Sequence, residues 1–207
     1  VSGAKKFDVD LRDYSKIESL DKEAGLVLLT SHTGNWQVVF DALGKMDKPV
    51  NLLMLPEVSQ TMHKAIDFKS GRQIINIISP EQHLGGVVEM MNALNRGEVV
   101  CIMGDRHYGS PIVEVEFLGS TAYFPYSAFQ IAASAKAPVG ILLSSKTSLS
   151  SYQVDIPDIL TPVLKRGSDR KEQLREYVQK YAQILEGYLM KHPLQYFVFR
   201  DIWSEKE

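Results

Sequence analysis

The feature that most constrains the fold is an apolar run followed at once by a polar turn. Residues Leu26–Thr30 show no polar alternation, which is typical of a strand buried on both faces of a sheet. The run ends in Ser-His-Thr-Gly-Asn, and from Trp36 onward the hydrophobic spacing becomes helical. This strand, turn and helix predict a parallel α/β unit with His32 at the C-terminal end of the strand, where ligands bind in open α/β sheets.

The turn itself carries candidate functional groups. Gly34 lets the backbone turn sharply, and Asn35 is a favourable N-cap for the helix that follows. His32 is therefore expected to face the positive end of a helix, where it can act as a general base near neutral pH. The competing interpretation is a loop histidine that is hydrogen-bonded to the backbone, which is the more common situation for a histidine at a strand end.

The rest of the chain alternates in the same way, which predicts an α/β fold with a mostly parallel or mixed central sheet flanked by helices. We expect buried strands at 49–55, 73–78, 98–103 and 138–144, and helices at 58–68, 80–97, 126–136 and 169–191. We also expect a strand at 113–117 with one face toward solvent, a strand at 152–156 that pairs with 138–144, and a final strand at 195–199. One domain is predicted over residues 1–207, with 1–24 as its lead-in.

Composition narrows the class of protein. The formal net charge of -2 gives no reason to expect nucleic acid as a partner. The chain has a single cysteine, Cys101, so an internal disulfide framework is excluded and a reducing cytoplasmic location is favoured. Cys101 lies in an apolar run, which favours a buried packing residue. No apolar run is long enough for a transmembrane helix, and the start of the chain has no signal-peptide pattern.

A second candidate site follows another predicted buried strand. Asp105 and Arg106 come directly after the strand at 98–103, so they should open at the same sheet edge as His32. His107 comes next and could line the same cleft. The alternative is that Asp105 caps a turn and pairs with Arg106 on the surface. The sequence contains no phosphate loop, dinucleotide fingerprint or zinc pattern, so no metal or cofactor is expected.

Residues 32–36, His-Thr-Gly-Asn-Trp, resemble the His-x-Gly-Asn-Trp-Glu signature of the lipid A biosynthesis (late) acyltransferase family. This family is a branch of the glycerolipid acyltransferase superfamily. Further blocks follow in the family's order over residues 25–203: Gly104–Arg106, Val115–Gly119, Phe124-Pro125, Ala132-Ala133, Ala137–Val139 and His192–Trp203. The resemblance implies a single glycerolipid acyltransferase-like domain. Family members usually carry an N-terminal membrane anchor, so an upstream anchor that is absent from this chain is consistent with the resemblance.

The resemblance also implies a function. The expected enzyme moves a fatty acyl group from an acyl carrier protein or coenzyme A thioester to a hydroxyl of a lipid or glycolipid. It works without a cofactor, at a membrane surface on the inner face of the cell membrane. His32 is then the general base, and Arg106 binds a phosphate of donor or acceptor or helps to stabilise the oxyanion. Gly34, Asn35 and His107 would complete the substrate site, Asn35 together with backbone N–H groups of the helix start.

The sixth position of the signature departs from the family. An acidic residue normally follows the histidine by five positions and stabilises the charged imidazole, whereas this chain has Gln37. Three interpretations are open: Gln37 is an inactivating change that leaves fold and binding intact, Asp41 or Asp105 replaces the acid, or Gln37 suffices for a less demanding acceptor. The alternative functions are therefore an acyl- or lipid-binding domain, or an ester or thioester hydrolase that uses His32 and water.

Overall fold

The computed structural model describes residues 7–20, 23–35, 38, 48–55, 75–81, 83–107 and 109–204. The strands of the main sheet are β1 (Asp8–Leu11), β2 (Leu26–Thr30), β3 (Val50–Leu53), β4 (Ile75–Ile78), β5 (Val99–Met103), β8 (Val139–Lys146), β9 (Ser151–Asp155) and β10 (Ile159–Leu160). The helices are α1 (Ser15–Glu18), α4 (Val87–Asn95), α5 (Ser127–Ala135) and α6 (Arg170–Leu189). The strands β6 (Ile112–Phe117) and β7 (Ser120–Pro125) form a separate hairpin.

The main sheet is mixed but mostly parallel, as predicted. Its strand order is β1-β9-β8-β2-β5-β3-β4, with β10 paired to β8. The run β8-β2-β5-β3-β4 is parallel throughout, whereas β9 and β10 are antiparallel to β8. The strand β2, which leads to His32, therefore lies between two parallel neighbours, β5 and β8.

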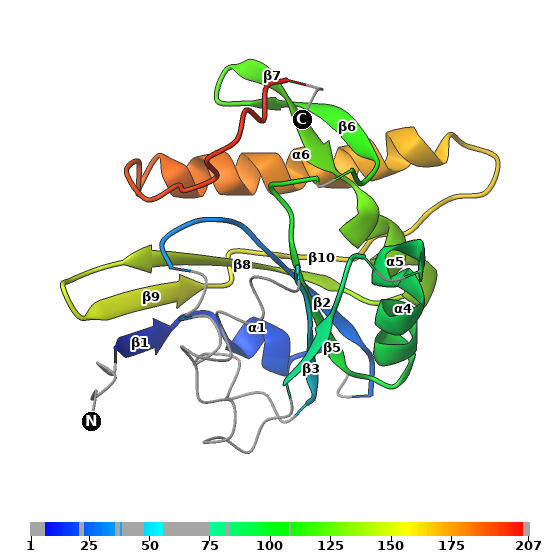
Figure 1. Ribbon diagram of the computed structural model, residues 1–207, viewed down its shortest axis with the longest axis horizontal. Helices are drawn as coiled ribbons and strands as arrows, with labels where there is room; N and C mark the ends of the chain where they lie inside the picture. The colour runs from blue at the N-terminus through cyan, green and yellow to red at the C-terminus, as the bar shows by residue number, and fades with distance from the viewer. Residues whose placement is uncertain are drawn as a thin grey trace.

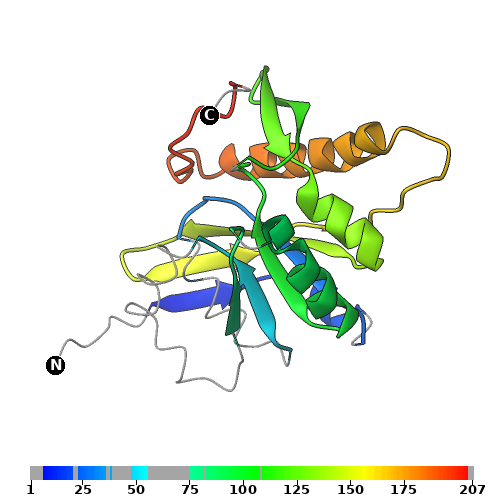
Figure 2. The ribbon, with the colours of Figure 1, turned by 45° about the vertical axis from the view of Figure 1, so that its right-hand side comes forward.

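Helices cover the sheet in layers (Figures 1 and 2). Both views place α4, α5 and α6 on one side of the sheet, and α6 lies between the sheet and the β6–β7 hairpin. The side chain of Gln179 on α6 bonds the backbone of Glu116 on β6 in both directions, which fixes the hairpin to the helix. Within the described residues, no helix has the length and apolar character needed to cross a bilayer.

The side chains of β2 pack alternately into two hydrophobic clusters, one on each face of the sheet, which explains why the strand has no polar alternation. Val27 and Leu29 pack into the cluster formed with the helices α4, α5 and α6, while Leu26 and Leu28 pack into the cluster that contains residues of α1 and β9. All four are at most 4% exposed. Burial of each such side chain stabilises the fold by about 1.5–3 kcal/mol, so the strand that leads to His32 is firmly held by the core.

The predicted final strand at 195–199 is wrong. This segment forms only an isolated bridge, between Tyr196 and Thr33. Both sides of β2 are already occupied by β5 and β8, so no sheet edge is free there. Phe199 also adopts a left-handed backbone conformation (φ 47°), which ends any extended run.

Other predictions differ in detail. The strands β1, β7 and β10 were not predicted. The first and last of these are short, and β7 begins with polar residues and ends in a proline, so it shows neither an apolar run nor a clear alternation. The buried strand expected at 73–78 is β4, which lies at the end of the strand order and has only Ile78 buried. The helix expected from residue 80 begins only at Val87, after left-handed residues at 84–86, and its buried face is Met90, Ala93 and Leu94, while Val87 and Val88 are exposed. The helices predicted after Trp36 and at 58–68 lie outside the described residues.

The longest helix agrees with its prediction. Asp169 is the N-cap of α6, where its carboxylate accepts the backbone N–H groups of Lys171 (2.8 Å) and Glu172 (3.3 Å). The hydrophobic spacing of the sequence predicts one apolar face for this helix, and all of its members are buried in the core: Leu174, Val178, Tyr181, Leu185 and Tyr188. This burial points Tyr181 down toward the ends of β2 and β5, where the candidate site lies.

Candidate active site

The register of two parallel strands brings the two candidate motifs together. Thr30 on β2 pairs with Met103 on β5, so the residues two positions further on, His32 and Asp105, leave the sheet side by side. The C-terminal edge of a parallel sheet is where such loops converge. The sequence prediction that both motifs open at one edge is therefore correct.

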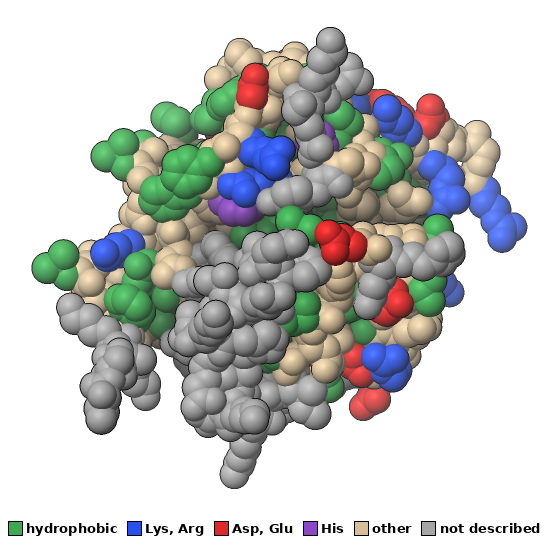
Figure 3. All heavy atoms as spheres, viewed as in Figure 1, with side chains coloured by type: hydrophobic (Ala, Val, Ile, Leu, Met, Phe, Trp, Pro, Cys, Tyr) green, Lys and Arg blue, Asp and Glu red, His purple; other side chains and the backbone are tan. Residues whose placement is uncertain are grey.

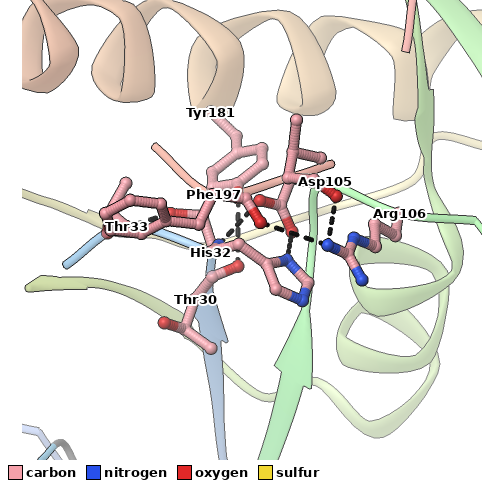
Figure 4. A network of polar contacts seen from close by, with 9 residues as sticks. Thr30, His32, Thr33, Asp105, Arg106, Tyr181 and Phe197 are labelled. Carbon is pink, nitrogen blue, oxygen red and sulfur yellow. Dashed lines mark hydrogen bonds and ion pairs between the residues drawn. The ribbon is translucent and has the colours of Figure 1, made fainter. Parts of the chain in front are cut away.

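His32 and Asp105 make two hydrogen bonds with each other (Figure 4). The imidazole Nδ1 lies 2.8 Å from Oδ1 of Asp105, and the backbone N–H of His32 donates to Oδ2 at 2.7 Å. The Asp105 side chain is fully buried, whereas the His32 side chain is 14% exposed. The surface interpretation of Asp105 is thus wrong, and the carboxylate holds both the ring and the backbone of the histidine.

This arrangement sets the chemical state of the imidazole. A carboxylate only accepts hydrogen bonds, so the proton of a neutral His32 ring is placed on Nδ1. The lone pair then lies on Nε2, at the far side of the ring from Asp105. A ring in this tautomer can take a proton through Nε2, and Asp105 can stabilise the resulting imidazolium.

Two glycines allow the loops to approach this closely. Gly104 donates its N–H to the carbonyl of Thr30 (2.8 Å), and a Cβ on it would lie 2.7 Å from the side chain of Leu29 and 3.0 Å from that of Tyr181. Gly34 has a φ of +56°, and a Cβ there would lie 2.5 Å from the carbonyl oxygen of Ser144. The predicted site residue Gly34 therefore has a clear structural role in seating the His32 turn against β8.

Two tyrosines lie close to the buried carboxylate, and neither was predicted from the sequence as a site residue. Tyr181 donates its hydroxyl to the Thr30 carbonyl at 3.0 Å. Burial raises its pKa, and the charge of Asp105 raises it further. The buried hydroxyl of Tyr196 has no hydrogen bond of ordinary geometry within the described chain, and its pKa is also raised by burial and then by Asp105. Tyr181 was predicted only as a core residue, and its helical spacing gives no sign of the carboxylate.

The C-terminal segment closes the site from a third direction. The N–H of Phe197 donates to the His32 carbonyl at 2.7 Å, and the N–H of Gly34 donates to the carbonyl of Gln195 at 2.8 Å. Arg106 reaches across through Nη2 to the carbonyl oxygens of Phe197 (3.2 Å) and Val198. A block near the end of the sequence is thereby fixed against one near its start.

The other predicted site residues stand as follows. Asn35 and His107 are both half-buried beside the site, and substrate binding by either of them stays a prediction. Gln37 and Asp41 lie outside the described residues. Among the described residues, no group of three or more His, Cys, Asp or Glu side chains could hold a metal ion. A pocket between β6 and the start of α6 is lined by none of the predicted site residues.

Comparison with known proteins identifies the family. Residues 4–205 match the family described as bacterial lipid A biosynthesis acyltransferase. The chain belongs to this family. No curated protein sequence matches it. A solved structure with a similar fold is the 1-acyl-sn-glycerophosphate (LPA) acyltransferase PlsC from Thermotoga maritima, with a TM-score of 0.50 and 14% identity over 89% of this chain and 73% of that chain.

The match confirms the predicted resemblance to the lipid A biosynthesis acyltransferase family, and the PlsC likeness confirms the predicted glycerolipid acyltransferase-like fold. In this member of the family, three of the blocks recognised in the sequence converge on one point. The His32 turn, the Gly104–Arg106 block and the closing block at 192–203 all contribute atoms within hydrogen-bonding distance of one another.

Proposed function

We propose that this protein is an acyltransferase in which His32 and Asp105 form the catalytic pair. The observation that carries the proposal is the 2.8 Å contact between His32 Nδ1 and Asp105 Oδ1. It supports the interpretation in which a second carboxylate replaces the acid that is missing at position 37. It also disfavours the non-catalytic binding domain, for which we would expect no carboxylate within reach of the histidine.

The proposed reaction transfers a fatty acyl group from an acyl carrier protein or coenzyme A thioester to a hydroxyl of a lipid or glycolipid. Nε2 of His32 takes the hydroxyl proton as the oxygen attacks the thioester carbonyl, and a C–O bond forms. The C–S bond then breaks, and the leaving thiolate receives the proton from the imidazolium. Asp105 stabilises the imidazolium between these two steps.

Other residues support the remaining needs of this reaction. The tetrahedral intermediate needs hydrogen-bond donors for its oxyanion, and the backbone N–H groups near Asn35 are suitably placed in sequence for this role. Arg106 supplies a positive charge beside His32 that would attract a phosphate of the donor or acceptor. We place the reaction at the inner face of the cell membrane, where a lipid acceptor would be available.

The decisive experiment measures thiol release from acyl-coenzyme A and from acyl carrier protein, with and without a lipid acceptor. We expect His32→Ala to lower turnover by about 10³- to 10⁴-fold, because the general base is lost. His192→Ala is the matched control, because it also removes an imidazole, but one that packs on the ring of Tyr188 with centroids 4.7 Å apart. We expect this variant to keep near-native turnover. Equal turnover by His32→Ala and the native protein would rule out the proposal, and release of free fatty acid with no acylated lipid would favour the hydrolase.

A further inference from the structure

The C-terminal segment that closes the site also carries an unusual share of exposed hydrophobic side chains. We define the apolar strip as Met190, Leu194, Phe197, Phe199 and Trp203, which are 73%, 89%, 40%, 85% and 43% exposed. Between them, Val198 and Ile202 are buried in the core. The segment is therefore held in place from below while the strip side chains project outward.

The conformation of Phe199 is strained. Its φ of 47° lies in the left-handed region, which is costly for a bulky side chain and is retained only where the surroundings impose it. The neighbouring Phe197 ring stacks on it at 6.0 Å between centroids, so both rings stay together at the surface. The fold thus holds two aromatic rings in water at a cost, as expected of a surface that an apolar partner covers.

Cations stand among the side chains of the strip. Lys191 and Arg200 are exposed within the described part of the segment, where Asp201 is the one acidic residue over 190–204, and Arg106 adjoins it through the Phe197 carbonyl. The last three residues of the sequence add Glu205, Lys206 and Glu207, so basic and acidic side chains are equal in number over 190–207. Figure 3 shows hydrophobic side chains over this segment and the end of α6, with Lys or Arg and His side chains beside them. Apolar groups and cations therefore share one face.

We propose that the apolar strip docks this protein on an anionic lipid bilayer. Aromatic and aliphatic side chains that project beside cations are typical of segments buried at the boundary between headgroups and acyl chains. The cations are attracted to the negative surface of such a bilayer. An acidic carrier protein would be attracted to the same cations. The side chains that dominate protein–protein binding, however, lie in well-packed pockets. Leu194 and Phe199 are instead almost fully exposed, which favours a lipid bilayer.

The geometry links this contact to the reaction. Because the Phe197 N–H bonds the His32 carbonyl, a docked strip sets the base close to the headgroup level, where a lipid hydroxyl lies. The choice of a lipid partner rests on the proposed function. Binding to vesicles, however, is measured without any acyl donor, so the two proposals can fail separately.

The test is flotation of the full chain with phosphatidylcholine vesicles and with vesicles that also contain phosphatidylglycerol. We expect binding to the anionic vesicles, weaker binding to the neutral ones, and release by salt. Leu194→Ser and Phe199→Ser should each lower partitioning about tenfold, since each removes one inserted apolar group. Leu149→Ser is the matched control: Leu149 is also 89% exposed, but it lies in the β8–β9 turn, and its loss should change nothing.

The outcomes separate cleanly. Strip-dependent binding by both native protein and His32→Ala supports the proposal, and it does so even if no thioester turnover is found, a result that would contradict only the proposed function. Absent vesicle binding, or an equal loss in Leu149→Ser and Leu194→Ser, overturns it. Strip variants that keep vesicle binding but lose affinity for an acyl carrier protein also overturn it, in favour of a protein-docking surface.

Discussion

The ends of β2 and β5 are built alike, yet their functional side chains are placed very differently. Each strand is almost wholly buried, and each is followed two residues later by an ionisable side chain. His32 keeps 14% of its side chain accessible, whereas Asp105 keeps none. One strand end thus presents a partly accessible imidazole, and its neighbour supplies the buried carboxylate that holds it.

The difference teaches where the support for the histidine comes from. The family signature places the acid on the same turn and helix as the histidine, so the pair is local in sequence. Here the carboxylate comes from the adjacent strand, 73 residues away, through the register of β2 and β5. The pairing therefore depends on the register of the sheet rather than on the residues that follow Asn35 in the sequence.

The strongest test of this comparison removes the charge of the hidden partner. Asp105→Asn should lower kcat about 10³- to 10⁴-fold, because an amide no longer stabilises the imidazolium or fixes the tautomer. Steady-state thioester turnover measures the effect. His32→Ala combined with Asp105→Asn should be hardly worse than either change alone, since the two residues act as a unit. Additive losses would mean that the residues act independently and would break the comparison.

The second test concerns the turn that carries the exposed partner. Gly34→Ala should destabilise the fold by about 2–4 kcal/mol, because the left-handed φ and the contact with the Ser144 carbonyl both oppose a Cβ. Gly119→Ala is the matched control, with a φ of +77° but nothing within 4 Å, and it should cost only about 1 kcal/mol. Urea unfolding gives both values, and equal losses would show that space at Gly34 is unimportant.

A third test addresses the enclosure of Asp105. The pKa of Tyr181 and that of Tyr196 are raised above 10.0 by burial and by the carboxylate. Above that pH the unfolded tyrosines lose their protons while the folded ones keep them, so stability should fall as pH rises past 10. Tyr181→Phe should flatten this fall and cost about 1 kcal/mol at neutral pH, through loss of the bond to Thr30. An unchanged slope in alkaline urea titrations would argue against an enclosed site.

The smallest effect is expected at the position that departs from the signature. If Asp105 already occupies the imidazole Nδ1, Gln37→Glu should change kcat by no more than about threefold, because Nδ1 has room for one acceptor. The same assay, run in parallel on Asp105→Asn, shows which of positions 37 and 105 has the larger effect on kcat. A large gain of activity in Gln37→Glu would instead indicate that the chain is a disabled enzyme whose local acid has been lost.

Much of the fold could be predicted because burial in the core requires hydrophobic residues at regular positions, and this spacing is visible in short stretches of the sequence. The strands β2 and β5 each bear a nearly unbroken apolar run, β3, β4 and β8 are mostly apolar, and α6 shows its cap and buried face in the sequence. The segment at 195–199 shows the same kind of run but is not a strand. Its backbone partners lie across the His32 turn, and strand order is not visible in an apolar pattern.

The site was predictable only in part for the same reason. His32 was identified from its strand end, and Asp105 was one of two carboxylates that could replace the missing acid. Choosing between Asp105 and Asp41 requires the pairing of β2 with β5, which no local pattern encodes. Tyr181 reaches the site from α6, a helix whose crossing over the sheet is set by packing, and so its spacing suggested a core residue and nothing more.

The bond between Phe197 and the His32 carbonyl also bears on when the protein becomes competent. During synthesis β2 and β5 emerge early, but β8 and the segment that holds Phe197 emerge late, and distant pairings of this kind close slowly. A growing chain therefore carries its histidine long before the loop around it is fixed. Since the same late segment bears the apolar strip, the proposed chemistry and the proposed contact with a bilayer both depend on a segment that is synthesised after β2 and β5.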